Sequence, residues 1–255
     1  DGGVMGELRI RDLKPIGARK DLELYFDNIP SELINTKVSV KESGRYISCD
    51  PKVAYYSTKL QTERLETLRF AKELRNELNR PLAICDPFCG VGPALSTLIA
   101  EEGLAGNILA SDLNLSAVEL LFENLRRWDK REYPTKSEKL QQYYDDRIVG
   151  LADATKLSQN PQYSGKWDMV LVNLPHRTIE FLPALIPLLN RSNVSLIRGR
   201  VIVAESDIQS ANKKINEILP PIVASKPKPE LKIKRDYSSA LRLCSFEAWI
   251  EKDTT

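Results

Sequence analysis

The run I-C-D-P-F-C-G-V-G-P over residues 84–93 holds the residue types in this chain that are best suited to ligand binding. It follows an apolar, strand-like segment (residues 82–84) and precedes a helix-like segment (residues 94–101). A carboxylate and a glycine turn at such a junction lie at the carboxyl edge of a parallel sheet, where α/β folds bind nucleotide-like ligands. The residues predicted to contact that ligand are Asp86, Phe88, Gly90, Gly92 and Pro93.

The composition of this turn restricts the kind of ligand. The third glycine of the dinucleotide-binding fingerprint is missing, and Pro93 stands where a pyrophosphate-binding helix would offer a free N–H group. The turn therefore suits a ligand that has an adenosine group but no phosphates. S-adenosylmethionine is the leading candidate for the cofactor.

Two further aspartates follow predicted strands and extend this cofactor site. Asp112 ends the second strand, and a carboxylate there can accept both ribose hydroxyls, although it could instead cap the next helix. Asp153 follows the third strand, where contact with an adenine amino group and capping are about equally plausible. The neighbouring residues Leu113, Asn114 and Ala154 complete the predicted cofactor site.

The fourth predicted strand ends in the tetrapeptide Asn173-Leu-Pro175-His176. A side-chain amide and a carbonyl at a strand end, with a proline restricting the backbone, can both face the edge of a planar substrate. We therefore predict that Asn173 contacts both substrate and cofactor and that Pro175 shapes the substrate site. An ordinary turn at the strand exit is the alternative, and His176 could either donate a hydrogen bond near the site or be a packed loop residue.

Metal and thiol chemistry are not expected. The four cysteines lack paired C-x-x-C spacing, and His176 is the single histidine, so we predict no metal site. Cys85 and Cys89 flank the glycine turn without a histidine base nearby in sequence, which favours packing over a nucleophilic role.

Strand-like and helix-like segments alternate from Asp86 onward, which is typical of a parallel sheet covered by helices on both faces. The pattern predicts an α/β, Rossmann-like class I methyltransferase domain with a seven-stranded, mostly parallel sheet that ends in a hairpin. Residues 129–146 interrupt the alternation and are predicted to form a surface excursion. The predicted strands are residues 82–84, 107–112, 147–152, 167–173, 200–205, 231–234 and 242–250, and the predicted helices are residues 94–101, 117–127, 179–189 and 208–219.

The region before residue 58 has a different pattern. Short alternating segments separated by Gly, Asn, Pro and Asp predict a small β-rich domain over residues 5–57. A helix over residues 62–78, with leucines at three- and four-residue steps, joins it to the methyltransferase domain over residues 58–255.

Composition places few limits on partners. In this chain of 255 residues, 42% are hydrophobic, 28% are charged and the net charge is +2, so a nucleic-acid surface would have to come from local clusters of basic residues. No apolar run is long enough to cross a bilayer, and no signal-peptide pattern opens the chain; we expect a cytoplasmic monomer. The two basic clusters, each also explicable as solvated surface, are Lys226, Lys228, Lys232, Lys234 and Arg235, and Arg126, Arg127, Lys130 and Arg131.

Several segments together resemble a known family. The sequences Val40-Lys-Glu-Ser-Gly44, Asp50-Pro-Lys52 to Arg64, Asp86 to Pro93, and Asn173-Leu-Pro-His-Arg-Thr-Ile-Glu180 are similar to those of archaeal and eukaryotic tRNA (guanine-N1)-methyltransferases. Those enzymes modify the purine at tRNA position 37, beside the anticodon. The same family includes the aminocarboxypropyltransferases of wybutosine synthesis.

The resemblance implies a function and a set of site residues. It implies methyl transfer from S-adenosylmethionine to guanine N1, with an anticodon-loop purine of tRNA as the substrate. Glu63 would be the general base, and a buried glutamate takes a proton more readily than an exposed one. Asn173 and Pro175 would orient the base, Tyr55 would shape its pocket, and Arg9 or Arg11 would stabilise charge on guanine O6.

Other functions stay open at this point. Glu63 could merely complement the helix dipole beside Arg64. The chain could instead transfer the aminocarboxypropyl group of the same cofactor, methylate a protein or a small molecule, or be a non-catalytic RNA-binding module.

Overall fold

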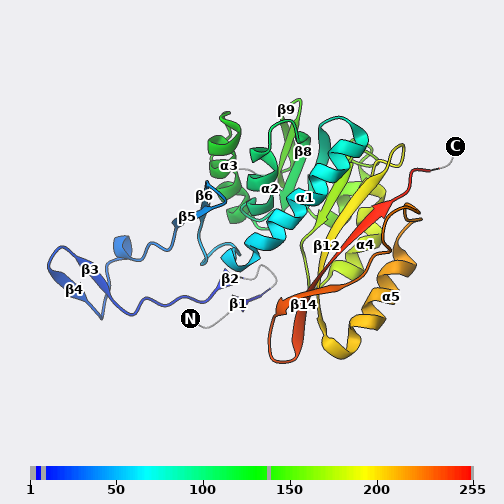
Figure 1. The fold of residues 1–255 in the computed structure, drawn as a ribbon. Helices are drawn as coiled ribbons and strands as arrows, with labels where there is room; N and C mark the ends of the chain where they lie inside the picture. The colour runs from blue at the N-terminus through cyan, green and yellow to red at the C-terminus, as the bar shows by residue number, and fades with distance from the viewer. Residues whose placement is uncertain (1–3, 7–9, 137–138, 254–255) are drawn as a thin grey trace.

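A computed structural model describes residues 4–6, 10–136 and 139–253 of the chain. Its centre is an eight-stranded sheet with helices on both sides (Figure 1), which confirms the predicted Rossmann-like α/β class. In spatial order, the strands are β13 (Lys232–Asp236), β14 (Leu241–Ile250), β12 (Ser195–Ala204), β11 (Met169–Val172), β7 (Leu82–Asp86), β8 (Ala105–Asp112), β10 (Arg147–Leu151) and β9 (Gln141–Tyr144).

In the central strands, successive apolar side chains point alternately toward the helices on either face of the sheet. In β11, Met169 and Leu171 pack in one core cluster, whereas Val170 and Val172 pack in another on the opposite face. A strand that is apolar on both faces must be covered by helices on both sides, as the centre of a parallel sheet requires. The helices are α1 (Gln61–Leu78), α2 (Pro93–Ala100), α3 (Leu115–Asp129), α4 (Thr178–Leu185) and α5 (Ile208–Ile218).

The sheet contains one strand more than predicted. The five strands β12, β11, β7, β8 and β10 run parallel, while β14 is antiparallel to β12 and β13 is antiparallel to β14. The additional strand β9 pairs antiparallel with β10 at the edge and lies within residues 129–146, which we had predicted to be a surface excursion. Its sequence Gln-Gln-Tyr-Tyr is half polar because an edge strand is partly solvated, so it carries little apolar signal.

In the described residues before α1, the chain forms three small hairpins. They are formed by β1 (Val4–Met5) with β2 (Ile10–Arg11), β3 (Ala18–Lys20) with β4 (Glu23–Tyr25), and β5 (Val38–Glu42) with β6 (Arg45–Cys49). Ile47 and Cys49 of β6 are buried in a cluster with residues of α3. The β5–β6 hairpin thus shares a core with the sheet, and the domain boundary at residue 57 stays a prediction.

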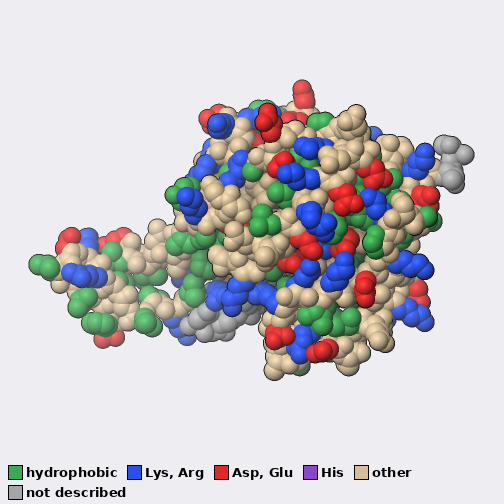
Figure 2. All heavy atoms as spheres, viewed as in Figure 1, with side chains coloured by type: hydrophobic (Ala, Val, Ile, Leu, Met, Phe, Trp, Pro, Cys, Tyr) green, Lys and Arg blue, Asp and Glu red, His purple; other side chains and the backbone are tan. Residues whose placement is uncertain are grey.

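The β3–β4 hairpin projects away from the rest of the molecule (Figure 1), and Figure 2 shows hydrophobic side chains gathered on it. Ile16 and Leu22 expose 91% and 90% of their surface. In the described part of the chain, none of the helices combines the length and apolar character needed to span a membrane.

Many side chains of the two predicted basic clusters form contacts within the protein. Lys226 lies 2.8 Å from Glu73 and over the ring of Trp249, and Arg131 lies 2.5 Å from Asp146. Arg126 donates to the backbone oxygens of Tyr133 and Pro134. These three side chains therefore stabilise local structure.

Candidate functional site

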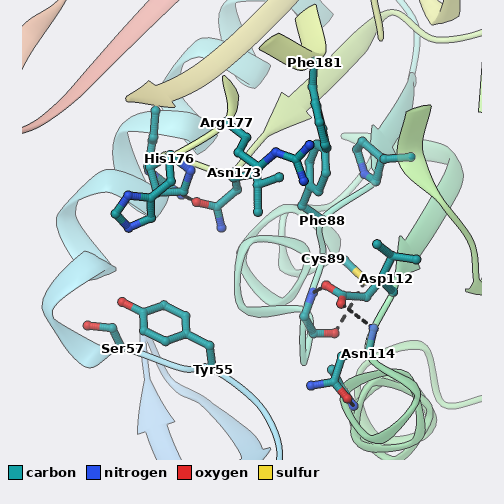
Figure 3. A pocket seen from close by; sticks show the side chains of 18 of the residues that line it. Tyr55, Ser57, Phe88, Cys89, Asp112, Asn114, Asn173, His176, Arg177 and Phe181 are labelled. Carbon is teal, nitrogen blue, oxygen red and sulfur yellow. Dashed lines mark hydrogen bonds between the residues drawn. The ribbon is translucent and has the colours of Figure 1, made fainter. Parts of the chain in front are cut away.

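A cavity of about 640 Å³ opens where the carboxyl ends of β7, β8, β10 and β11 meet the loop that precedes α1. Figure 3 shows Tyr55 and Ser57 of that loop on one side of the open space and Phe88 and Asp112 on the other. Parallel α/β sheets bind ligands at this edge. The sheet therefore places most of the predicted cofactor and substrate residues around one volume.

The glycine turn after β7 holds Asp112 against the cavity. The N–H of Gly90 donates to Asp112 Oδ2 at 2.8 Å, and the N–H of Asn114 donates to Asp112 Oδ1 at 2.9 Å. Gly90 has φ +54°, and a Cβ added there would meet only Tyr55 O, at 3.8 Å. The missing side chain thus leaves this wall open beside a fixed carboxylate.

Asp86 is buried at the end of β7 rather than exposed in the cavity. It is only 2% exposed, and its Oδ1 has no hydrogen-bond partner in the described structure. Burial raises the pKa of Asp86 to about 7, with the Asp112 carboxylate adding to the shift. Asp86 therefore lies behind the turn, and it is not among the residues that line the cavity.

The structure distinguishes the two capping alternatives. Asn114, and not Asp112, is the N-cap of α3, and its side chain accepts from the N–H groups of Ser116 and Ala117. Asp153 does cap the following 3₁₀ turn, because it accepts from the N–H and the hydroxyl of Thr155. These bonds, with burial opposing them, lower the pKa of Asp153, which also lines the cavity as a carboxylate.

Asn173 lies beside an arginine that the sequence analysis did not select. Arg200 Nη1 donates to Asn173 Oδ1 at 2.6 Å, and both residues line the cavity. Pro175 is buried, and its carbonyl accepts from the N–H of Ile202, which fixes the strand exit against β12. A signal for Arg200 was present in the sequence, because Arg198 and Arg200 stand two residues apart in an otherwise apolar strand, so both point to the same face.

Glu63 is buried among cations behind the cavity wall. It is 6% exposed and does not line the cavity. Its Oε2 lies 3.2 Å from Arg198 Nη2 and 3.9 Å from Arg200 Nε, and its Oε1 lies 3.4 Å from Lys234 Nζ. The carboxylate is thus tied to the cavity through Arg200, and its role as a base stays a prediction.

The loop that carries Tyr55 is held from two sides. Arg64 of α1 donates to both oxygens of Glu42 at 2.6 Å and to the carbonyl of Ser57 at 2.8 Å. On the other side, Asn114 Nδ2 donates to the carbonyl of Val53 at 2.6 Å. Buried, charge-assisted bonds of this kind fix a loop more firmly than surface contacts do. Tyr55 consequently lines the cavity from a rigid segment.

Aromatic side chains complete the wall. The rings of Phe88 and Phe181 stack with centroids 6.0 Å apart, and Arg177 lies over the Phe181 ring. His176 is exposed at the edge of the cavity, where its Nε2 lies 3.2 Å from Tyr237 OH. Flat apolar surfaces of this kind suit the faces of a nucleobase.

The cavity brings together most of the predicted site and leaves a few residues outside it. Gly92 packs behind the turn against Leu121 and Trp128. Arg11 lies in β2 and is not among the residues that line the cavity, and Arg9 lies outside the described residues. The predicted residues that line the cavity are Tyr55, Phe88, Gly90, Pro93, Asp112, Leu113, Asn114, Asp153, Ala154, Asn173 and Pro175.

The cysteines lie in the interior of the protein. All four are buried and free. Burial raises the pKa of the Cys89 thiol well above its ordinary value, so this residue stays protonated although it borders the cavity.

Comparison with known proteins identifies the family. Residues 38–217 match the TRM5/TYW2 methyltransferase domain, so the chain belongs to this family. It is 27% identical over 191 residues to tRNA (guanine(37)-N(1))-methyltransferase Trm5b of Pyrococcus abyssi (strain GE5 / Orsay), an alignment that covers 75% of this chain and 44% of that protein. It is 28% identical over 143 residues to the tRNA (guanine(37)-N(1))-methyltransferase of Paramecium tetraurelia, covering 56% of this chain and 31% of that protein. The chain therefore spans less than half of these relatives.

Solved structures agree on the fold. A complex of aTrm5 with tRNALeu matches with a TM-score of 0.66 and 20% identity, covering 98% of this chain and 59% of that one. TYW2 of M. jannaschii in complex with AdoMet matches with a TM-score of 0.65 and 18% identity, covering 86% of this chain and 88% of that one. The resemblance seen in the sequence is thus confirmed for the family and for the fold.

Proposed function

We propose that this chain is an S-adenosylmethionine-dependent tRNA methyltransferase that methylates N1 of guanosine at position 37. The observation that carries the proposal is the cavity, in which the glycine turn with Asp112 and the Asn173-x-Pro175 strand exit face one volume. Membership of the TRM5/TYW2 family supports this choice. So does the similarity to relatives named as guanine(37)-N(1) methyltransferases.

The cavity fits the proposed cofactor. The fixed Asp112 carboxylate would repel a phosphate but can accept ribose hydroxyls. Phe88, Leu113 and Ala154 offer apolar contacts, and Asp153 can accept from an adenine amino group. The turn around Gly90 leaves room for a ligand beside these groups. When bound, the cofactor supplies an electrophilic methyl group.

The remaining chemistry falls to side chains of the protein. Guanine N1 carries a proton at neutral pH and is a weak nucleophile, so its methylation needs a base aligned with the donor. We assign this role to Glu63, whose carboxylate lies beside Arg200 of the cavity wall. Asn173 would orient the purine edge, and Tyr55 would border its ring.

Aminocarboxypropyl transfer from the same cofactor is the second candidate. One observation favours it: the chain covers 88% of the TYW2 chain that it resembles, against 59% of the aTrm5 chain. Both reactions would use the same cavity. The chemical group found on the product distinguishes them.

Nucleoside mass spectrometry tests the proposal. Unmodified tRNA carrying G37 is incubated with the protein and S-adenosylmethionine, and we expect N1-methylguanosine at position 37. Glu63→Gln removes the proposed base and should slow the reaction by about 10²- to 10⁴-fold. Glu217→Gln, at an exposed surface pair with Lys213, is the matched control and should leave the rate unchanged.

Three results would contradict the proposal. They are a tRNA that stays unmodified, a product that carries an aminocarboxypropyl group, and a Glu63→Gln variant as fast as its parent. The first would contradict the proposed activity, the second the proposed reaction, and the third the role of Glu63 as the base.

A further inference from the structure

Arg200 is a buried cation in the wall that faces the proposed target base. It is only 6% exposed, yet it lines the cavity beside Asn173. Burial lowers its pKa to about 10, with the Glu63 carboxylate opposing the shift, so it stays protonated at neutral pH. A buried charge is costly, and it persists only where its partners are well placed. Arg200 therefore has fixed partners on both sides.

The first partner is Asn173, whose amide orientation Arg200 determines. A guanidinium group can only donate, so the atom of Asn173 that lies 2.6 Å from Arg200 Nη1 must be the oxygen. The Asn173 Nδ2 group then faces away from Arg200. Figure 3 shows this side chain reaching into the space between Tyr55 and Phe88. Asn173 is thereby held as a donor toward the cavity.

The second partner is Glu63, which holds the other side of the guanidinium. Glu63 Oε2 lies 3.9 Å from Arg200 Nε, and that Nε makes no hydrogen bond within the described structure. Glu63 is itself anchored by Arg198 at 3.2 Å. The fork of Arg200 is thus oriented by one carboxylate and one amide oxygen.

The resulting wall presents donors and positive charge. A purine with a carbonyl oxygen at C6 places an acceptor against this wall, and loss of its N1 proton moves negative charge onto that oxygen. A purine with an amino group at C6 would place a donor against donors, which leaves buried polar groups unpaired. A site built to hydrogen-bond one group rejects an analogue that lacks it far more strongly than an apolar site can.

We propose that Arg200 is the residue that makes this site select 6-oxopurines over 6-aminopurines, by holding Asn173 as a donor and by stabilising charge on the base oxygen. This inference rests on the proposed function. It assigns to Arg200 the charge stabilisation that the family resemblance had suggested for Arg9 or Arg11. Arg200 acts on the base from the cavity wall, and it acts through Asn173 on the orientation of the base.

The test compares three tRNA transcripts that carry guanosine, inosine or adenosine at position 37. The wild-type protein should methylate the guanosine and inosine transcripts at rates within about tenfold of each other, and the adenosine transcript at least about 10³-fold more slowly. Arg200→Gln should slow guanosine methylation by about 10²- to 10³-fold and lower the guanosine-to-adenosine rate ratio at least tenfold. The methylation rate of this variant should also begin to rise at a higher pH than that of the wild type, because the N1 proton is harder to remove without the cation.

Two further variants control for folding and for buried charge. Arg200→Lys keeps the charge and should restore part of the guanosine rate, which covers the case in which Arg200→Gln fails to fold. Arg147→Gln removes a buried arginine of β10 that pairs with Asp129 and does not line the cavity. It should lower the melting temperature without changing the guanosine-to-adenosine ratio. Calorimetric titration with S-adenosylmethionine checks that each variant still binds the cofactor.

The possible failures can be told apart. A wild-type protein that leaves the guanosine transcript unmodified overturns the proposed function and this inference with it. An active wild type whose folded Arg200 variants keep the same rate ratio and pH profile overturns this inference alone. Equal loss of selectivity in Arg147→Gln would also overturn it, because the effect would then come from the general loss of buried charge.

Discussion

At the scale of single residues, the site depends on carboxyl groups whose surroundings differ. Asp112 accepts two backbone N–H bonds and faces the cavity, whereas Asp86 is fully enclosed with one oxygen unpaired. Burial also raises the pKa of Asp112, against the lowering effect of its backbone hydrogen bonds. Two similar residues at neighbouring strand ends thus take separate roles, one toward a ligand and one toward the fold.

Asp86→Asn should change the pH dependence of stability. Because burial raises the pKa of Asp86 to about 7, the folded protein keeps a proton between about pH 4 and 7 that the unfolded chain has lost. The free energy of unfolding of the wild type therefore falls as the pH rises through this window. The free energy of unfolding of Asp86→Asn, measured relative to that of the wild type, should rise by up to about 1.4 kcal/mol per pH unit and level off above pH 7. Urea denaturation at several pH values measures it.

The control for this measurement is Asp253→Asn, an exposed carboxylate near the end of the described chain. The difference in free energy of unfolding between Asp253→Asn and the wild type should not rise with pH in this way. A difference for Asp86→Asn that stays constant from pH 4 to 8 would contradict the assigned pKa.

The sequence predicted some site residues and missed others for a physical reason. Asp112 could be placed because its position at a strand end follows from the linear order of strand, turn and helix. The contact of Arg200 with Asn173 could not be predicted, because it depends on the register of two strands. In the structure Val172 pairs with Gly199, which brings the next residues, Asn173 and Arg200, side by side.

At the scale of elements, the turn between β7 and α2 sets the position of the cofactor wall. Gly92 takes φ +81° at the N-terminus of α2, and Pro93 follows at the first helical position, where its fixed backbone favours the helix. The N–H of Gly92 donates to the carbonyl of Cys89 at 2.8 Å and closes the turn. The position that a side chain would occupy at Gly92 faces Leu121 and Trp128 of α3.

Gly92→Ala should destabilise the protein more than the same substitution of a glycine whose surroundings are open. Its Cβ would lie 2.5 Å from Leu121 Cδ1 and 3.1 Å from Trp128 Cζ3. We expect a loss of about 1–2 kcal/mol from the left-handed backbone and about 1–3 kcal/mol more from overpacking. Gly103→Ala, at φ +66° with no atom within 4 Å, should show the backbone term alone. Equal losses in urea denaturation would contradict this packing.

The predicted elements were most accurate where apolar periodicity was strong. The long helix predicted over residues 62–78 and the strand over residues 82–84 correspond to α1 and β7. The fifth strand was predicted to start at residue 200, but β12 begins at Ser195. The predicted start was too late because the buried arginines at 198 and 200 interrupt the apolar run that marks the strand. Ion pairs with α1 compensate these charges, and a linear pattern does not contain that information.

At the scale of the whole molecule, Asn124 connects the β5–β6 hairpin to the sheet. Its side chain is fully buried, accepts from Ser48 N at 2.7 Å, and donates to Ser48 O at 3.0 Å and Val91 O at 2.9 Å. One residue of α3 therefore joins the hairpin, the helix and the glycine turn. This coupling explains why residues before position 57 can line a cavity at the strand ends.

Asn124→Ala should loosen this connection. It leaves three buried backbone groups without partners, and we expect a loss of about 3 kcal/mol or more in the free energy of unfolding. Hydrogen exchange should show faster exchange of the Ser48 amide than in the wild type. Asn216→Ala, on the exposed face of α5, is the control and should cost less than about 1 kcal/mol. A Ser48 amide that stays protected in Asn124→Ala would contradict this role.

The central claim is that the cavity at the strand ends binds S-adenosylmethionine, and calorimetric titration of the protein with this compound tests it most directly. We predict saturable binding of one molecule per chain, weakened at least about tenfold by Asp112→Asn, because an amide replaces one of the acceptor oxygens. Asp253→Asn should bind as the wild type does. Absence of saturable binding in the wild type, or unchanged affinity in Asp112→Asn, would contradict the account.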